Sequence, residues 1–183
     1  MSRVRAGVVI QAGFFAAAAV ALAAVQGCEE ACPTIGCQDR FTATASGADG
    51  TLPAGSHRVD VTADGQAFTC TFTFPIDAMN GLQLASCTPG VQLQIRADQT
   101  CTETTTGNAQ RIQCTPIPGR FSEELTLLGR PEQIHVEQSV GGALLLDETA
   151  TPAYAPVSPG GPGCGPVCRQ AAVTWSLATP AAQ

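Results

Sequence analysis

The sequence predicts an all-β fold: an antiparallel two-sheet sandwich, of which the immunoglobulin type is one candidate, braced by disulfides and preceded by an N-terminal signal helix. Three observations support this prediction. Apolar and polar residues alternate over about eight short segments. No long stretch after Cys28 has the helical period of an amphipathic helix. Nine cysteines in a chain of 183 residues are typical of an exported, disulfide-bonded domain.

The first 27 residues have the three-part layout of a secretory signal peptide. Arg3 and Arg5 form a short basic segment, and the apolar run Ala6–Val25 follows it. The run leads into Val25-Gln26-Gly27-Cys28, which resembles the bacterial lipobox, the motif whose cysteine is lipidated. Because the motif directly follows the apolar run, the resemblance is specific.

The lipobox resemblance implies a lipid anchor at Cys28. In that family the cysteine receives diacylglycerol on its sulfur, becomes the new N-terminus, and is acylated on its amine by a chain such as palmitate. Glu29, rather than Asp, follows the cysteine, which implies the outer membrane. Two alternatives remain open: the apolar run spans a bilayer uncleaved, or cleavage occurs without lipidation.

Beyond the signal peptide, residues 1–27, we expect a short lipid-anchored tether, residues 28–38, and one β-sandwich domain, residues 39–183. All nine basic residues are arginines, and two of them lie in the signal peptide. The exported part therefore carries seven arginines against fifteen carboxylates, a formal charge of −8. An acidic surface without a basic stripe argues against nucleic acid as a partner, because phosphate neutralisation needs clustered lysine and arginine.

Period-two alternation defines the strands of the β-domain one by one. The first strand carries Phe41, Ala43 and Ala45 on one face. The strongest element is a hairpin over His57–Phe74, which turns at Asp64-Gly65. The later predicted strands are Val91–Ala97, Leu125–Leu128, Ile134–Val140, Ala143–Ala150 and Ala171–Leu177.

Two segments lack a clear strand pattern. Thr100–Thr106 runs into the turn signal Gly107-Asn108, so we interpret Cys101–Cys114 as a loop or short hairpin closed by its two cysteines. Ser158–Gly165 is a loop rich in glycine and proline. The inward side chains expected to form the core are Phe68, Phe72, Phe74 and Trp175.

Setting Cys28 aside for the lipid leaves an even number of cysteines, which independently favours lipidation. These disulfide candidates are Cys32, Cys37, Cys70, Cys87, Cys101, Cys114, Cys164 and Cys168. Sequence alone does not determine how they pair. Because short loops close most easily, we favour the sequence-local set Cys32–Cys37, Cys70–Cys87, Cys101–Cys114 and Cys164–Cys168. The alternative is long-range pairing between the Cys32/Cys37 region and the Cys164/Cys168 region.

The cysteine spacings argue against a metal or redox role. Four residues separate Cys32 from Cys37 and three separate Cys164 from Cys168. In zinc ribbons, by contrast, about two residues separate the cysteines of each pair. The segment Cys164–Cys168 superficially resembles a thioredoxin-type redox site. That site has one intervening residue fewer and a helix behind it, where this chain has a predicted strand. We therefore predict no metal and no cofactor.

No catalytic residue is predicted. Of the two histidines, His57 shares the inward face of the hairpin, so a structural role is expected. His135 alternates outward beside Glu137, on a solvated strand face. The adjacent carboxylates Glu123 and Glu124 point to opposite faces of a strand, so they cannot flank one bond.

Three stretches carry a wider resemblance: Leu52–Phe72, Cys114–Phe121 and Gly163–Gln170. Together they look like a group of uncharacterised, cysteine-bearing lipoproteins of high-GC myxobacteria, and the likeness covers most of the mature chain. The resemblance implies an envelope location. It brings no activity, cofactor or catalytic residue.

The expected function is that of a non-enzymatic lipoprotein of the cell envelope, a structural or protein-binding module held at the bilayer by the lipid on Cys28. Sandwiches recognise partners through loops and sheet edges, and the candidate surfaces for an envelope protein partner are Cys101–Cys114 and Ser158–Cys168. One alternative is a small-ligand or ion-binding protein, which needs a cavity or converging oxygen ligands. The other is a hydrolase that uses His57 or His135.

Overall fold

The computed structural model describes residues 36–75, 82–106, 109–161 and 163–179. The chain divides into two compact units, Met1–Cys32 and Pro33–Gln183, and all the described residues belong to the second. The predicted signal peptide, the lipidation site Cys28 and the disulfide candidate Cys32 lie outside the described residues. Among the residues that are described, no helix is long and apolar enough to cross a bilayer.

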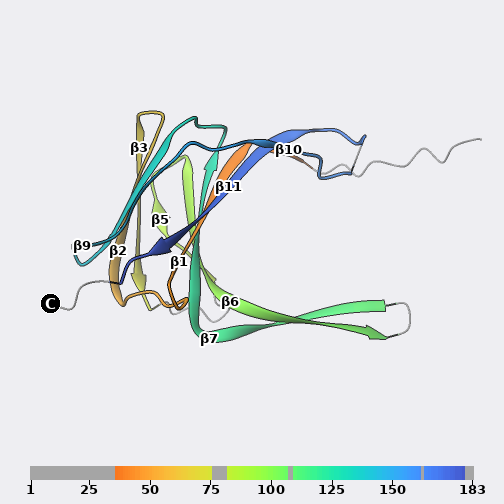
Figure 1. Ribbon diagram of the computed structural model, residues 1–183, viewed down its shortest axis with the longest axis horizontal. Helices are drawn as coiled ribbons and strands as arrows, with labels where there is room; N and C mark the ends of the chain where they lie inside the picture. The colour runs from red at the N-terminus through yellow and green to blue at the C-terminus, as the bar shows by residue number, and fades with distance from the viewer. Residues whose placement is uncertain (1–35, 76–81, 107–108, 162, 180–183) are drawn as a thin grey trace, which may run out of the picture. The chain divides into compact units, whose positions relative to one another are not determined.

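The second unit contains two β-sheets, called sheet A and sheet B (Figure 1). In spatial order, sheet A consists of β10 (Ala155–Val157), β11 (Cys168–Leu177), β1 (Arg40–Gly47), β7 (Ala109–Leu128), β6 (Val91–Thr106) and β4 (Leu82–Leu84). Sheet B consists of β5 (Ser86–Cys87), β3 (Gln66–Phe74), β2 (Gly55–Ala63), β8 (Ile134–Val140) and β9 (Ala143–Ala150). Apart from β1 and β11, which run parallel, neighbouring strands are antiparallel. The predicted all-β architecture with two sheets is confirmed, and the immunoglobulin type stays a prediction.

The predicted alternation places the core between the two sheets. In β1 the side chains of Phe41, Ala43 and Ala45 are buried, as expected from their spacing. The β2–β3 hairpin turns where predicted, and Asp64 takes the left-handed conformation there with φ of 48°. Buried side chains at alternate positions of β2, β3 and β8, and of short parts of β6 and β7 around Ile95 and Leu125, complete one continuous core.

The four aromatic residues expected in the core divide into two pairs. Phe68 and Phe72 are buried, whereas Phe74 and Trp175 are half-buried and pack against the edge of the core. The ring of Trp175 lies 6.4 Å from that of Phe41, which joins the parallel strands β11 and β1 on their inner face. Phe68 and Phe72 therefore belong to the core itself, and Phe74 and Trp175 pack against it.

The hairpin of β6 and β7 is much longer than the sequence predicted. Strands were expected over 91–97 and 125–128, but β6 has 16 residues and β7 has 20. Their outer halves, residues 99–106 and 109–116, pair from Gln99↔Pro116 to Thr106↔Ala109. This two-stranded ribbon, which we call the arm, extends away from the two sheets (Figure 1). The remainder of both sheets is called the body.

An irregular junction separates the arm from the body. The pairing of β6 with β7 shifts between Ala97 and Gln99, and residues 117–120 of β7 have no partner in the register. Pro116 and Pro118 lie at this place and have no N–H to donate to the ladder. Gly119 has φ of 75°, which only glycine adopts at little cost. The sheet therefore bends here, and the ribbon leaves the core.

The structure corrects two of the four favoured cysteine pairs. Cys70–Cys87 and Cys101–Cys114 are disulfides, as predicted. Cys37 pairs with Cys168 across 131 residues, so the local pairs Cys32–Cys37 and Cys164–Cys168 are wrong. Cys164 is also disulfide-bonded. The long-range bridge forms because β1 and β11 are adjacent and parallel, which brings Cys168, the first residue of β11, close to Cys37, three positions before β1. Such bridges are compatible with an oxidising, exported environment.

Candidate functional site

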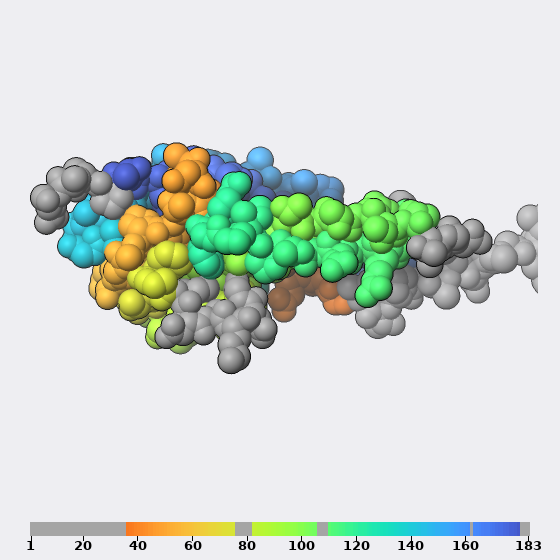
Figure 2. All heavy atoms as spheres, turned by 90° about the horizontal axis from the view of Figure 1, so that it is seen from below, coloured from red at the N-terminus to blue at the C-terminus, as the bar shows by residue number. Residues whose placement is uncertain are grey.

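The arm is the first of the two surfaces that the sequence suggested for binding. All its side chains whose burial is described are exposed, including Ile112, of which 69% is accessible. The disulfide Cys101–Cys114 joins directly paired residues in the middle of the ribbon. Figure 2 shows the arm, in green, projecting beyond the body. An isolated hairpin is marginally stable in water, so the disulfide supplies stability that the arm does not gain from buried side chains.

The second predicted surface, Ser158–Cys168, is a loop fixed at its end. Cys164 and Cys168 are buried, whereas Val167 between them is 62% exposed. The bridge from Cys168 to Cys37 fastens the loop to the segment that precedes β1. In Figure 1 this region, which follows β10, and the arm project from the body in the same direction.

A groove of about 690 Å³ crosses the outer face of sheet A, and Pro159 of the second surface is among its lining residues, whereas no residue of the arm is. Its walls come from the segment before β1, from β6 and β7 on the body side of the junction, and from the start of β11. Four glutamines and one threonine line it, together with one arginine and one glutamate. The polar lining residues are Gln38, Arg40, Gln92, Gln94, Glu124, Thr126 and Gln170. Amides and hydroxyls of this kind both donate and accept hydrogen bonds.

A buried polar cluster joins the two sheets inside the body. Glu123 of β7 faces Gln138 of β8 and His57 of β2, and at most 2% of each of these residues is exposed. Gln138 Nε2 donates to Glu123 Oε1 at 2.8 Å and to His57 Nδ1 at 3.2 Å. His57 Nε2 lies 2.8 Å from the carbonyl oxygen of Pro53. These contacts agree with a neutral imidazole that carries its proton on Nε2.

Burial controls the titration of this cluster. Desolvation raises the pKa of Glu123 to about 7, against which the hydrogen bond from Gln138 acts. Desolvation lowers the pKa of His57, and the hydrogen bond to Pro53 opposes that shift. His57 also stacks on Phe72, with ring centroids 4.4 Å apart. The cluster therefore lies within the core, away from solvent.

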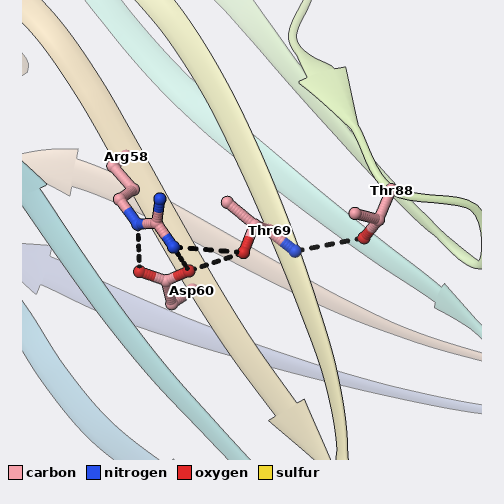
Figure 3. A network of polar contacts seen from close by, with 4 residues as sticks. All are labelled: Arg58, Asp60, Thr69 and Thr88. Atoms are coloured by element: carbon pink, nitrogen blue, oxygen red, sulfur yellow. Dashed lines mark hydrogen bonds and ion pairs between the residues drawn. The ribbon is translucent and has the colours of Figure 1, made fainter.

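The outer face of sheet B carries an exposed polar network around Asp60 (Figure 3). Arg58 donates to both carboxylate oxygens of Asp60, at 2.6 and 2.8 Å, and the hydroxyl of Thr69 donates to it at 2.6 Å. The backbone N–H of Thr69 in turn donates to Thr88. The hydrogen bonds from Arg58 lower the pKa of Asp60. Both carboxylate oxygens of Asp60 thus accept hydrogen bonds from neighbouring side chains.

Beside this network, His135 and Glu137 of β8 meet Asp147 of β9. His135 Nε2 lies 2.8 Å from Asp147 Oδ1. The imidazole nitrogen and one oxygen from each carboxylate all lie within 4.8 Å of one another. Imidazole nitrogen and carboxylate oxygen are ligands of divalent transition metals. Among the described residues, this is a group of side chains that could hold such an ion.

The two histidines that the sequence offered for a hydrolase site lie apart in the structure. His57 lies inside the core, and His135 lies on the outer face of sheet B, half-buried. Glu123 and Glu124 point to opposite faces, as predicted: Glu123 is buried, and Glu124 pairs with Arg96 at 3.2 Å on the outer face. Gln138 and Asp147 were not predicted from the sequence as parts of a site. Gln138 had a signal, since it continues the inward alternation of Ile134 and Val136.

Comparison of the chain with protein-family models, with curated protein sequences and with solved structures finds no match.

Proposed function

We propose that this chain is an exported envelope lipoprotein, anchored by a lipid on Cys28, that binds an envelope protein through the outer face of sheet A. It acts without catalysis, as a structural or recognition module. The observation that carries the proposal is the disulfide-closed arm beside the polar groove. A ribbon with no buried face adds nothing to the core, so its sequence is free to serve recognition.

The groove and the arm suit an extended protein segment. Glutamine and threonine side chains along β6 and β7 offer donors and acceptors to a polypeptide backbone. The apolar side chain of Ile112 on the arm and that of Leu128 at the groove are 69% and 63% exposed. Exposed apolar groups within a polar surface are typical of protein interfaces.

The anchor places this surface near the membrane. Cys37, which the disulfide to Cys168 fixes to the body, lies nine positions after Cys28. A fully extended tether of that length reaches about 30 Å. The body therefore stays close to the lipid headgroups, and the partner is a protein of the same membrane surface. The resemblance of residues 25–28 to a lipobox supports the anchor, and the glutamate that follows Cys28 favours the outer membrane.

Site-specific photo-crosslinking in cells that produce the protein natively tests the binding surface. A photoreactive residue replaces Ile112 in the arm, Gln94 in the groove, or Gln66 at the turn of the β2–β3 hairpin as the control. We expect one adduct of the same mass from the first two positions and none from Gln66. Adducts of equal yield from all three positions, or none from Ile112 and Gln94, would contradict the proposal.

The intact mass of the membrane-extracted protein tests the anchor. We expect the mass of residues 28–183 plus a diacylglyceryl group and one acyl chain. Replacement of Cys28 by serine should release the protein from the membrane fraction. A mass that retains the first 27 residues, or that lacks the lipid, would show that the protein is held in another way.

A further inference from the structure

The outer face of sheet B holds an unusual run of acidic residues across three adjacent strands. Asp60 of β2 is paired with Glu137 of β8, and Glu137 is paired with Asp147 of β9. Like charges at directly opposite positions destabilise a sheet. Arg58 neutralises Asp60 (Figure 3), and His135 lies 2.8 Å from Asp147, but the side chain of Glu137 has no hydrogen bond or ion pair with another described residue. The charge of Glu137, between two other carboxylates, is therefore the one without a partner.

A β-bulge creates this juxtaposition. The two-residue turn at Gly141-Gly142 starts the β8–β9 register at Val140↔Ala143, and an unbroken ladder would set Glu137 opposite Leu146. The register shifts between Gln138 and Ser139, so that Asp147 takes that place. Bulges serve to re-aim side chains near functional sites. Here the bulge turns a carboxylate toward Glu137 and His135.

We propose that His135, Glu137 and Asp147 form a binding site for a divalent first-row transition cation, of which Zn²⁺ is the representative. The three donors are His135 Nε2 and one oxygen from each carboxylate, all within 4.8 Å of one another. Such an ion removes the repulsion between the paired carboxylates. An imidazole with two carboxylates is a donor set suited to zinc, whereas Ca²⁺ and Mg²⁺ prefer oxygen ligands alone.

Only small movements are needed to close the site. Donors in a tetrahedral zinc site lie about 3.4 Å apart, as follows from bonds of about 2.1 Å. The His135–Asp147 distance of 2.8 Å is already shorter than this, and Glu137 is exposed and free to rotate toward them. The ion bonds to the lone pair of His135 Nε2, so any proton on that nitrogen leaves to solvent or to Nδ1. Three protein ligands leave one position for water or for a donor from another molecule.

Zinc titration of the full chain with its disulfides intact, purified without a histidine tag, tests the site. The affinity is measured by calorimetry for the wild type, for Glu137→Gln, and for the matched control Glu148→Gln, which removes the same charge at the residue after Asp147. We expect Glu137→Gln and His135→Gln each to weaken binding at least about tenfold, and Glu148→Gln to change it less than about twofold. Far-UV circular dichroism confirms that each variant is folded.

Nuclear magnetic resonance of the wild type gives a readout that needs no variant. The chain has two histidines, so the imidazole spectrum contains two side chains. Zinc should shift the nitrogen resonances of His135 at the concentration that calorimetry finds, and leave those of the buried His57 in place. Equal losses from Glu137→Gln and Glu148→Gln, no heat of binding, or no movement of His135 would overturn the proposal. The cluster is then a hydrated ion pair of His135 with Asp147. The result does not depend on the function proposed for sheet A.

Discussion

Two cross-strand disulfides of similar size lie in opposite surroundings. Cys70–Cys87 in the body and Cys101–Cys114 in the arm both join directly paired residues, with Cα atoms 4.0 Å apart. They span 17 and 13 residues. Yet Cys70 is fully buried between the sheets, whereas both cysteines of the arm are exposed. A cross-strand disulfide thus stabilises both the body, which has a hydrophobic core, and the arm, which has none.

The two bridges differ in what else stabilises the strands that they join. In the body, buried apolar surface supplies most of the stability, and the bridge adds to one cooperative unit. In the arm, the bridge and the backbone ladder hold two strands that can separate without disturbing the core. We therefore expect changes in the body to alter global unfolding. Changes in the arm should alter local opening alone.

The largest contrast is expected between two isoleucines of the same hairpin. Ile95 of β6 is fully buried, and Ile112 of β7 is 69% exposed. Ile95→Ala removes buried methyl groups and leaves a cavity, so the free energy of unfolding should fall by about 3 kcal/mol. Ile112→Ala should change it by less than about 0.5 kcal/mol. Urea denaturation of both variants measures the two values, and a similar loss in both would show that the arm shares the core.

Removal of the body disulfide should have the next largest effect. The double substitution Cys70→Ala and Cys87→Ala frees a loop of 17 residues in the unfolded chain. The chain-entropy account gives a loss of about 3 kcal/mol for a loop of this size. β5 is only two residues long and pairs with β3 at the bridge, so its pairing should be lost as well. Thermal unfolding measures the change, and an unaltered midpoint would mean that β5 contributes nothing to the cooperative unit.

The strands of the body could be predicted from the sequence, whereas the strands of the arm could be predicted only in part. Alternation predicted the body strands correctly because burial of one face imposes a period of two on residues such as Phe41, Ala43 and Ala45. The arm buries neither face, so no such pattern marks its strands. The turn signal Gly107-Asn108 and the cysteine pair were the available clues, and they gave a short hairpin in place of a long one.

The candidate metal site was beyond reach of the sequence for a different reason. The predicted strands Ile134–Val140 and Ala143–Ala150 leave Gly141-Gly142 as a two-residue turn, but the register that follows from such a turn sets Glu137 opposite Leu146. A bulge, whose position depends on packing in the core, sets it opposite Asp147 instead. Likewise, the Cys37–Cys168 bridge follows from the parallel pairing of β1 with β11, and a parallel pair leaves no local mark in the sequence.

The buried glutamate in the body should make stability depend on pH. The pKa of Glu123 is about 7 in the folded protein, above its ordinary value of 4.5. The folded state therefore holds this proton more tightly, and its stabilisation is lost as the pH rises through about 7. His57 acts in the opposite sense, because its lowered pKa makes the folded state less stable as the pH falls below its ordinary value of 6.5.

The isosteric change Glu123→Gln separates these two contributions. The free energy of unfolding of the variant, minus that of the wild type, should rise by about 2 kcal/mol between about pH 5 and about pH 8. Only the part of the His57 contribution that does not depend on Glu123 cancels in this difference, because Gln138 contacts both side chains. Glu103→Gln removes one exposed carboxylate of the arm and serves as the control for the change in net charge. A difference that is constant with pH would show that Glu123 titrates alike in both states.

Removal of the arm disulfide should have the smallest effect on global unfolding and a large effect on the arm itself. Cys101→Ala with Cys114→Ala frees a loop nearly as long as that of the body bridge, so the entropic term is again about 3 kcal/mol. Here, however, the strands can separate while the body stays folded. The global loss then cannot exceed the free energy that holds the bridged arm closed, which we expect to be below about 1 kcal/mol for a ribbon without a core.

Hydrogen exchange distinguishes the two levels. Backbone amides within residues 99–106 and 110–115 should lose most of their protection in the double variant, whereas those of β2, β3 and β8 should keep theirs. A fall in global stability close to that of the body variant would mean that the arm and the body unfold together. The junction at residues 117–120 would then couple the unfolding of the arm to that of the body, and the ribbon would be a rigid extension of sheet A.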